Sequence, residues 1–292
     1  MMPIHHAGEL RFGMDKSGII ALVNRSPDLV DKHDRAGWLD LFSSNAIVQD
    51  PVGAGPNRKG RDIRRGKDAL GRFYDIFIGP NKISFEVHQD IVVNDEMVRE
   101  VSIHTTMPNG AITIVHCLLI YKVTEENGQL KIDSLRAHWD FGKNAMALMK
   151  NNGFKGMTAS TLQFYTMIKM QGVKRIIEYM GVICTGILKK GVKAANSFAV
   201  AVNAKDKVAF ARLLDTAAMV EFPVGSRPIA ATDLLKGADK DIKLEFKGLR
   251  SGGWFTSCVF DAKGKGLDNN GVAFFEFSQK TKKIINVRFF WN

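Results

Sequence analysis

The sequence predicts an α+β protein made of two similar domains that are joined by a helical connector. The first observation is an internal repeat, because AIVQDPVG at 46–53 and AMVEFPVG at 218–225 share five of eight residues. The second is that an amphipathic segment precedes each repeated turn and strand-like segments follow it. The third is a different segment between the copies, rich in Met, Gly and Lys. Helices followed by an antiparallel sheet are typical of the α+β class.

A short amphipathic helix is predicted before each repeated turn. When the two turns are set in register, Asp34 falls on Asp206 and Trp38 falls on Phe210. Leucine or phenylalanine follows each of these aromatic residues at three and four positions, which is the spacing of one helix face. The same helix therefore opens both copies.

Successive strands are predicted for the rest of each copy. Strand-like segments lie at 83–93, 97–106 and 111–123 in the first copy and at 242–249, 254–260 and 271–278 in the second. The ends also agree, because Trp139 in LKIDSLRAHWD falls on Trp291 in KKIINVRFFWN. We therefore predict one domain over 1–140 and a second, degenerate domain over 191–292, each with helices packed on a mostly antiparallel sheet.

Residues 141–190 form the predicted connector, which is basic, Met-rich and helical in pattern. The slightly longer range 141–193 holds nine Lys and Arg residues against the single acid Glu178, so it carries +8 of the net charge of +11. One interpretation is a set of amphipathic helices that cover one domain and leave their lysines in solvent. The other is a weak contact with an anionic membrane surface, because a basic helix with an apolar second face fits the lipid headgroup region.

The composition is that of an ordinary globular protein with a strong positive charge. The 292 residues suffice for two domains with separate cores. The charge raises nucleic acid, an anionic membrane surface or an acidic ligand as partners. Nucleic acid is disfavoured, because the two copies are close to neutral and carry no recognisable nucleic-acid-binding motif.

Cysteine usage and hydropathy favour a cytoplasmic protein. Cys117, Cys184 and Cys258 are odd in number and lack metal-binding spacing, which favours a reduced compartment. The N-terminal MMPIHHAGELRFG contains no apolar run of signal-peptide length. The longest apolar stretch, at 176–188, contains Glu178 and is too short to span a bilayer. We therefore expect neither a secreted nor a transmembrane protein.

The most family-specific stretches lie in the first copy. They are DRAGWLDLFSSNAIVQDPVGAGPNRKG at 34–60, GRFYDIF at 71–77 and SLRAHW at 134–139. With these motifs the first copy resembles the SnoaL-like and ketosteroid isomerase-like group of the NTF2-like superfamily. The second copy resembles it more weakly, through NAKDKVAFARLLDTAAMVEFPVGSRP at 203–228. The resemblance implies two cystatin-like cones, in which helices pack on a strongly curved sheet around a pocket, and it implies no cofactor.

Asp50 is the principal catalytic candidate. In the steroid isomerases that the first copy resembles, the Asp of the DPVG motif is the base that shuttles a proton, and Asp50 occupies that position. Such a base needs a mostly apolar pocket, where desolvation raises its pKa toward the working range. The alternative is that Asp50 only forms the turn before Pro51, as Asp commonly does.

The donors that stabilise the enolate in this family are replaced. On the resemblance, the tyrosine of the first helix falls on Ser26, and the later acid falls on Leu119, which would line the pocket. Tyr74 matches a supporting tyrosine and is a candidate proton donor. Because preorganised donors usually supply the largest catalytic term, these departures argue against classical steroid isomerase activity.

The strand at 98–106 offers a replacement. Side chains alternate along a strand, and the family's alignment places Glu100, Ser102 and His104 on the pocket face. His104 would then donate to a developing oxyanion or act as general acid opposite Asp50, while Glu100 and Ser102 would contact the substrate. The alternative is that His104 and Glu100 pair on a solvated sheet face, and a register shift of one residue would reverse every assignment.

Four large residues are expected to line the pocket or to fill the core beside it: Trp38, Phe73, Leu135 and Trp139. An aromatic wall is compatible with both interpretations, since aromatic rings bury large apolar areas in cores and in ligand sites alike.

The remaining histidines are not expected in the site. His116 and His138 have the opposite strand parity to the predicted pocket residues, which favours a surface or an interface. His5 and His6 lie in the N-terminal segment. No pair has metal-binding spacing, so we predict no metal site.

The second copy carries Phe222 where the first carries Asp50, and phenylalanine supplies no proton transfer. Glu221 next to it has the opposite strand parity. The second copy would bind a hydrophobic ligand or pack against the first. Domains of this superfamily usually pair through their sheets, which permits an intrachain pseudo-dimer or a homodimer.

Two functions remain open. The first is a cofactor-independent enzyme of isomerase, dehydratase or cyclase type, which abstracts a proton from a small, mostly apolar carbonyl compound of steroid-like or polyketide-like character. The second is a non-catalytic protein that binds small molecules or other proteins, in which Asp50 is a turn residue. Substitution of Asp50 separates the two.

Overall fold

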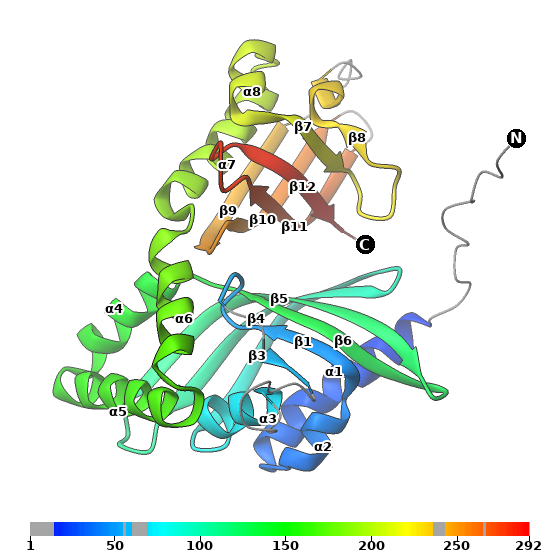
Figure 1. The fold of residues 1–292 in the computed structure, drawn as a ribbon. Helices are drawn as coiled ribbons and strands as arrows, with labels where there is room; N and C mark the ends of the chain where they lie inside the picture. Colours follow the sequence, from blue (N-terminus) through cyan, green and yellow to red (C-terminus); the bar gives the residue numbers. More distant parts are fainter. Residues whose placement is uncertain (1–14, 55–56, 60–68, 236–242, 265–266, 292) are drawn as a thin grey trace, which may run out of the picture.

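The computed structural model describes residues 15–54, 57–59, 69–235, 243–264 and 267–291. His5, His6 and part of the 34–60 motif lie outside these residues. The described chain forms two six-stranded sheets, each with helices packed on one face, as Figure 1 shows. The predicted α+β class is therefore confirmed, and the two sheets are consistent with the predicted tandem arrangement.

The first domain starts with two helices whose N-termini are capped by aspartates. Helix α1 (Lys16–Asp31) follows Asp15, and helix α2 (Arg35–Asp40) follows Asp34, whose carboxylate accepts a hydrogen bond from the Gly37 N–H at 2.9 Å. Further along the chain, α3 (Ala69–Phe73) continues into the π-helix η1 (Tyr74–Ile78). The strands are β1 (Phe42–Gln49), β2 (Asn57–Arg58), β3 (Lys82–Val93), β4 (Glu96–Thr106), β5 (Ile112–Glu126) and β6 (Gln129–His138).

The second domain repeats this order. Helix α8 (Lys207–Leu213) is capped by Asp206, the counterpart of Asp34, which accepts from the Val208 and Ala209 N–H groups. Helix α7 (Leu188–Asn203) precedes α8 as α1 precedes α2, and a 3-10 helix, η2 (Ala231–Leu235), follows the repeated turn. The strands are β7 (Leu214–Glu221), β8 (Ile229–Ala230), β9 (Lys243–Gly252), β10 (Phe255–Gly264), β11 (Leu267–Phe277) and β12 (Ile284–Phe290).

The two sheets have the same topology. Their strand orders are β2-β1-β6-β5-β4-β3 and β8-β7-β12-β11-β10-β9. In each sheet only the pairing of the first long strand with the last, β1 with β6 and β7 with β12, is parallel. The internal repeat of the sequence is thus a repeat of the whole sheet, since each strand has its counterpart six strands later.

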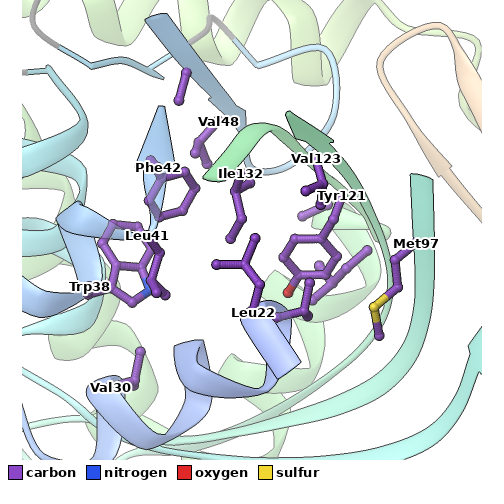
Figure 2. Packing of buried hydrophobic residues seen from close by; sticks show 14 of the residues in the cluster. Leu22, Val30, Trp38, Leu41, Phe42, Val48, Met97, Tyr121, Val123 and Ile132 are labelled. Atoms are coloured by element: carbon purple, nitrogen blue, oxygen red, sulfur yellow. The ribbon is translucent and has the colours of Figure 1, made fainter. Parts of the chain in front are cut away.

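A hydrophobic core lies between the helices and the inner face of the first sheet. Leu22 of α1 and Trp38 of α2 are buried in it with Tyr121 of β5 and Ile132 of β6. Figure 2 shows part of this core, with side chains from the helices facing those from the strands. Burial of such side chains stabilises each by about 1.5–3 kcal/mol relative to exposure. Side chains on the inner face of the first sheet point toward this core, so a site inside the domain would be lined by that face.

Three helices form most of the connector: α4 (Phe141–Asn152), α5 (Phe154–Gln171) and α6 (Val173–Thr185). They lie beside the first domain in Figure 1. The chain leaves α6 after Thr185 and turns at Gly186, where a Cβ atom would lie 2.1 Å from the Gly253 main-chain oxygen. The predicted boundary after residue 190 falls inside α7, so the bounds of the connector stay a proposal.

The outer faces of the two sheets pack against each other within the chain. Val98 and Leu118 of the first sheet are buried in one cluster with Val272 and Phe274 of the second. Arg288 pairs with Glu96 across this contact, and Arg250 of β9 pairs with Glu100 of β4 at 3.3 Å. Both faces of each sheet are therefore covered by protein over much of their area.

The repeated turns lie at this contact. A Cβ atom on Gly252 would lie 3.1 Å from the main-chain oxygen of Trp139 and 3.3 Å from a methyl group of Val52, in the first turn. In the reciprocal position, a Cβ atom on Gly225 of the second turn would lie 2.6 Å from the Asn94 amide nitrogen. Each turn thus touches the hairpin end of the other domain, so the second domain helps to hold the turn that carries Asp50.

Candidate active site

Asp50 lies at the end of β1, in a turn that is anchored to β6. The Asp50–Pro51 peptide bond is cis, as is the Phe222–Pro223 bond of the second copy. The Val52 N–H donates to the main-chain oxygen of Ala137 at 2.7 Å, which ties the turn to the neighbouring strand. The carboxylate of Asp50 accepts a hydrogen bond from the indole nitrogen of Trp139 at 2.6 Å.

Burial makes Asp50 a stronger base than an ordinary aspartate. The residue as a whole keeps some exposure, yet loss of solvent around its carboxyl raises the pKa of Asp50 to about 6, and the hydrogen bond from Trp139 works against that rise. A carboxyl with this pKa is mostly ionised at pH 7 and holds a proton better than a solvated one. These are the properties that a carbon-acid base needs.

The charge of Asp50 reaches buried groups on the inner face of β5. Burial, and secondarily the Asp50 charge, raises the pKa of the Cys117 thiol. Burial also raises the pKa of Tyr121, with the Asp50 charge as a smaller cause. Cys117 and Tyr121 are both buried with the core side chains around α1 and α2. Asp50 therefore faces the interior of the first domain.

Tyr179 of α6 reaches the same region from the connector. Burial, followed by the charge of Asp50, raises the pKa of Tyr179. Its ring contacts Phe141 edge-on at 6.4 Å, and Phe141 contacts Trp139 at 5.9 Å between ring centroids. Tyr179 also packs beside a small cluster that includes Ile76 of η1. The connector thus contributes a phenol to the surroundings of Asp50.

Tyr74 is a third phenol in the interior of the first domain, and the charges that act on its hydroxyl are those of Asp34, Arg35 and Asp75. Burial raises its pKa, and its hydroxyl has no hydrogen-bond partner among the described residues. Its ring packs on Trp38 at 5.4 Å. A buried hydroxyl without a partner costs free energy, so such groups commonly mark a place where another molecule supplies the partner.

The expected aromatic wall lies around Trp38. Its ring contacts Phe73 at 6.4 Å and Phe42 at 4.7 Å. Its indole nitrogen donates to the Ser26 hydroxyl at 3.0 Å, so the residue that replaces the family's tyrosine already serves a structural hydrogen bond. Leu119, Leu135 and Trp139 also pack against this inner core.

The expected arrangement of β4 is wrong. Val101 faces the inner core, and Ile103 packs against it, whereas Glu100, Ser102 and His104 lie on the outer face. Glu100 pairs with Arg250 of the second domain, as noted above. These three side chains therefore do not contribute to a site around Asp50.

Ser102 and His104 have their hydrogen-bond partners on the outer face of the sheet. Ser102 is hydrogen-bonded to His88 at 2.7 Å and to His116 at 2.8 Å. His104 has a side chain that is 39% exposed and lies 3.4 Å from a carboxylate oxygen of Glu86. The alternative of a solvated sheet face thus describes His104 correctly, although its partner is Glu86 and not Glu100.

The inner face of β4 carries a charge that was not anticipated. Arg99 is buried and makes two hydrogen bonds, at 2.7 and 2.8 Å, to the carboxylate of Asp90 on β3. It also donates to Asn24 of α1 at 2.5 Å. This pair lies in the core between α1 and the sheet and satisfies its own polar groups.

Tyr121 and Tyr179 were not predicted as site residues from the sequence. Strand parity could have indicated Tyr121, whereas no sequence pattern indicates Tyr179. Tyr121 shares the strand parity of Leu119, so placing Leu119 inside would have placed Tyr121 inside as well. Tyr179 lies in the connector, whose position on the first domain no local pattern predicts. His138 was expected at a surface or an interface, and it packs on Phe274 and Phe255 of the second domain at 4.7 and 5.7 Å.

The equivalent region of the second domain is filled by aromatic rings. Phe222 takes the place of Asp50 and contacts Trp291, the counterpart of Trp139, at 4.7 Å. It also contacts Phe289 at 4.9 Å, and Phe289 is fully buried with Phe198 and Phe275. The described interior of this domain therefore resembles a packed core more than a site.

The fold and the inward carboxylate define an α+β domain whose inner wall carries Asp50 at the end of β1. Residues 23–131 match the model of the SnoaL-like domain. This match covers most of the first domain and does not extend into the second. A comparison with curated proteins finds no match to the chain.

Solved structures similar to the chain include three with related descriptions. A Δ5-3-ketosteroid isomerase from Mycobacterium sp. is 28% identical and aligns with 43% of this chain and 95% of its own, at a TM-score of 0.37. A Mycobacterium tuberculosis protein in complex with estradiol-17beta-hemisuccinate is 23% identical, with coverages of 43% and 95% and a TM-score of 0.37. An epoxide hydrolase/cyclase-like enzyme of salinomycin pyran ring formation is 20% identical, with coverages of 44% and 95% and a TM-score of 0.35.

Proposed function

We propose that the first domain is a cofactor-independent enzyme that abstracts a proton from a carbon next to a carbonyl group, with Asp50 as the base. The observation that carries this proposal is the inward carboxylate of Asp50, held by Trp139 and with its pKa raised to about 6. The surrounding side chains are mostly apolar or aromatic. They suit a small, mostly apolar ligand of steroid-like or polyketide-like character.

The chemistry follows from the groups at hand. The Asp50 carboxylate takes a proton from the α-carbon, and the carbonyl oxygen gains negative charge as the enolate forms. In a β,γ-unsaturated ketone, return of this proton from Asp50 to the γ-carbon gives isomerisation. In a β-hydroxy ketone, the enolate expels the β-hydroxyl group, which takes the proton from Asp50 and leaves as water, so the result is dehydration. The phenols of Tyr179 and Tyr74 are the candidate donors to the enolate oxygen, in place of His104 on the other face of the sheet.

The test measures proton exchange directly. Wild type and Asp50→Asn are incubated in D2O with a panel of cyclic ketones and β,γ-unsaturated ketones, and deuterium incorporation at the α-carbon is followed by NMR. Loss of a general base lowers such rates by about 10²–10⁴-fold. Glu100→Gln is the matched control, because it removes a carboxylate from the outer face of the same sheet.

A non-catalytic ligand-binding function is the second candidate. It is favoured by Leu119 and Ser26, which stand at the family's donor positions, and by the use of Ser26 in the hydrogen bond from Trp38. If wild type exchanges no proton in any panel member, and both proteins bind the same ligands equally, this second function replaces the first.

We also propose that the second domain serves as an intrachain partner for the first, in place of a second chain. Its aromatic interior, the shared apolar cluster and the Arg250–Glu100 pair support this role. The expected result of sedimentation analysis is a monomer of 32.4 kDa. A stable dimer at micromolar concentration would contradict the proposal.

A further inference from the structure

The outward face of helix α5 is apolar. Phe154, Met157, Leu162, Phe164 and Tyr165 are all exposed on it, and the Phe154 side chain is 74% exposed. We call these five residues the α5 apolar face. Single exposed apolar residues are common on protein surfaces, whereas a contiguous group marks a contact with a partner or a lipid surface.

The spacing shows that this face is one side of the helix. At 3.6 residues per turn, positions 154, 157, 162, 164 and 165 fall on one arc of about 160°. The exposed Thr161 and Lys169 lie on the same arc. The buried residues Gly156, Ala159 and Met167 fall on the opposite arc. Gly156 allows close packing there, since a Cβ atom would lie 2.5 Å from the main-chain oxygen of Leu148 in α4. The helix is thus attached by one side and leaves its other apolar side uncovered.

The neighbouring helices also carry exposed apolar side chains. Met146 and Met149 of α4 are exposed, as are Val173 and Ile177 of α6. Together with the α5 apolar face, they make up nine of the seventeen exposed large apolar side chains found among the described residues. The connector therefore concentrates this kind of surface.

Lysines lie on and beside the α5 apolar face. Lys155 and Lys169 of α5 are exposed, and so are Lys150 of α4 and Lys174 of α6. The range 141–193 contains one acid against nine basic residues. A second copy of the chain would bring two such positive surfaces together, and their repulsion disfavours self-association. A surface that is apolar and negatively charged complements both features.

We propose that the α5 apolar face docks on a lipid bilayer whose surface carries anionic headgroups, with the helix parallel to the membrane plane. In the part of the chain that the structure describes, no helix is long and apolar enough to cross a membrane. The aromatic, Leu and Met side chains enter the headgroup region, and the lysines lie beside the lipid phosphates and carboxylates. An 18-residue helix offers about 27 Å of such contact.

Vesicle binding tests the proposal on the full chain. Flotation with vesicles of phosphatidylcholine alone is compared with vesicles that also contain about one third phosphatidylserine. The chain is expected to bind the anionic vesicles and to be released as salt rises, since screening weakens the lysine contribution. Absence from both kinds of vesicle overturns the proposal.

Paired variants separate the face from general apolar exposure. Phe154→Ser combined with Leu162→Ser is expected to lower partitioning onto anionic vesicles by about tenfold or more, because much apolar area is removed from the contact. The matched control is Val200→Ser combined with Val208→Ser, which removes two exposed apolar side chains from the second domain. Equal effects of the two pairs contradict the proposal.

Two further measurements check that the variants are folded and that the chain does not self-associate through the α5 apolar face. All four substitutions lie at exposed positions, so circular dichroism and urea midpoints are expected to stay within the small range typical of surface changes. Sedimentation of the chain without lipid detects self-association. A dimer that dissociates in the Phe154/Leu162 variant would assign the face to a second copy and overturn the lipid proposal.

Discussion

The indole nitrogen of Trp139 donates to the carboxylate of Asp50 at 2.6 Å, and the corresponding Trp291 in the second domain packs on Phe222 at 4.7 Å. The two tryptophans occupy the same position in the two sheets. In the first domain the residue opposite is an acid with a raised pKa, and in the second it is part of an aromatic core. One substitution thus separates a candidate site from a packed interior.

The hydrogen bond from Trp139 lowers the pKa of Asp50 against the effect of burial. Trp139→Phe removes the donor, so the pKa of Asp50 is expected to rise above about 6. Carboxyl-carbon NMR on aspartate-labelled protein measures this titration, with Asp50→Asn to assign the signal. Trp291→Phe is the control and should leave the titration unchanged. A pKa of Asp50 that falls in Trp139→Phe would contradict the assigned role of the hydrogen bond.

The raised pKa of Asp50 makes stability depend on pH. The folded pKa of about 6 exceeds the ordinary value of 3.8, so the stability present below pH 4 is lost as pH rises through 6. Asp50→Asn removes this loss. The free energy of unfolding of the variant is expected to gain on wild type by at most about 3 kcal/mol between pH 4 and pH 8. Urea unfolding at both pH values measures the difference, and a gain that is equal at pH 4 and pH 8 would speak against a buried, proton-binding Asp50.

The lowered pKa of His138 is expected to make the free energy of unfolding fall as pH decreases, which is opposite to the effect of Asp50. Burial between the sheets, and secondarily the charges of Arg136 and Arg250, lowers the pKa of His138 to about 3. Its stabilisation is therefore present above the ordinary value of 6.5 and is lost as pH falls toward 3. His138→Phe keeps an aromatic ring against Phe274 and cannot be protonated.

The measurement compares the two proteins at pH 8 and pH 5. Between these values the variant is expected to gain about 2 kcal/mol in the free energy of unfolding relative to wild type. The pH 8 data serve as the control for packing changes. A wild-type loss that persists unchanged in His138→Phe would assign the acid sensitivity to other groups.

The contact between the domains predicts a measurable coupling. Arg288 of β12 pairs with Glu96 of β4 and also lies 3.5 Å from Glu221. The side chains of Arg288 and Glu96 are mostly buried, so Arg288→Met leaves a carboxylate poorly paired and is expected to cost about 2 kcal/mol. A double-mutant cycle with Glu96→Gln should give a coupling of about 1–2 kcal/mol.

The exposed pair Lys247–Asp261 in the second domain is the matched control for that cycle. Exposed pairs typically contribute between 0 and about 1 kcal/mol. Similar coupling energies for the two pairs would indicate that the contact between the sheets is solvated and loosely held.

The strand parity of β4 shows where the sequence misleads. On a half-exposed sheet, the apolar residues of a strand mark the inner face. Here the outer face is also covered, so Val98 and Leu118 are as buried as Val101 and Cys117. The inner face in turn carries Arg99, neutralised by Asp90. The assignment of Glu100, Ser102 and His104 to the pocket came from the alignment with the family, and it is shifted by one residue from the inner face, which Val101 and Ile103 occupy.

The sequence by itself determined the tandem α+β architecture, the correspondence of Asp34 with Asp206, and the contrast between Asp50 and Phe222, because these features rest on local repeats and turn chemistry. Only the tertiary structure decided that Tyr179 approaches Asp50, that His104 lies outside, and that the α5 apolar face is left uncovered. The physical reason is that burial of a face depends on which distant surface packs on it, and the long-range contacts between sheets and connector have no signature in neighbouring residues.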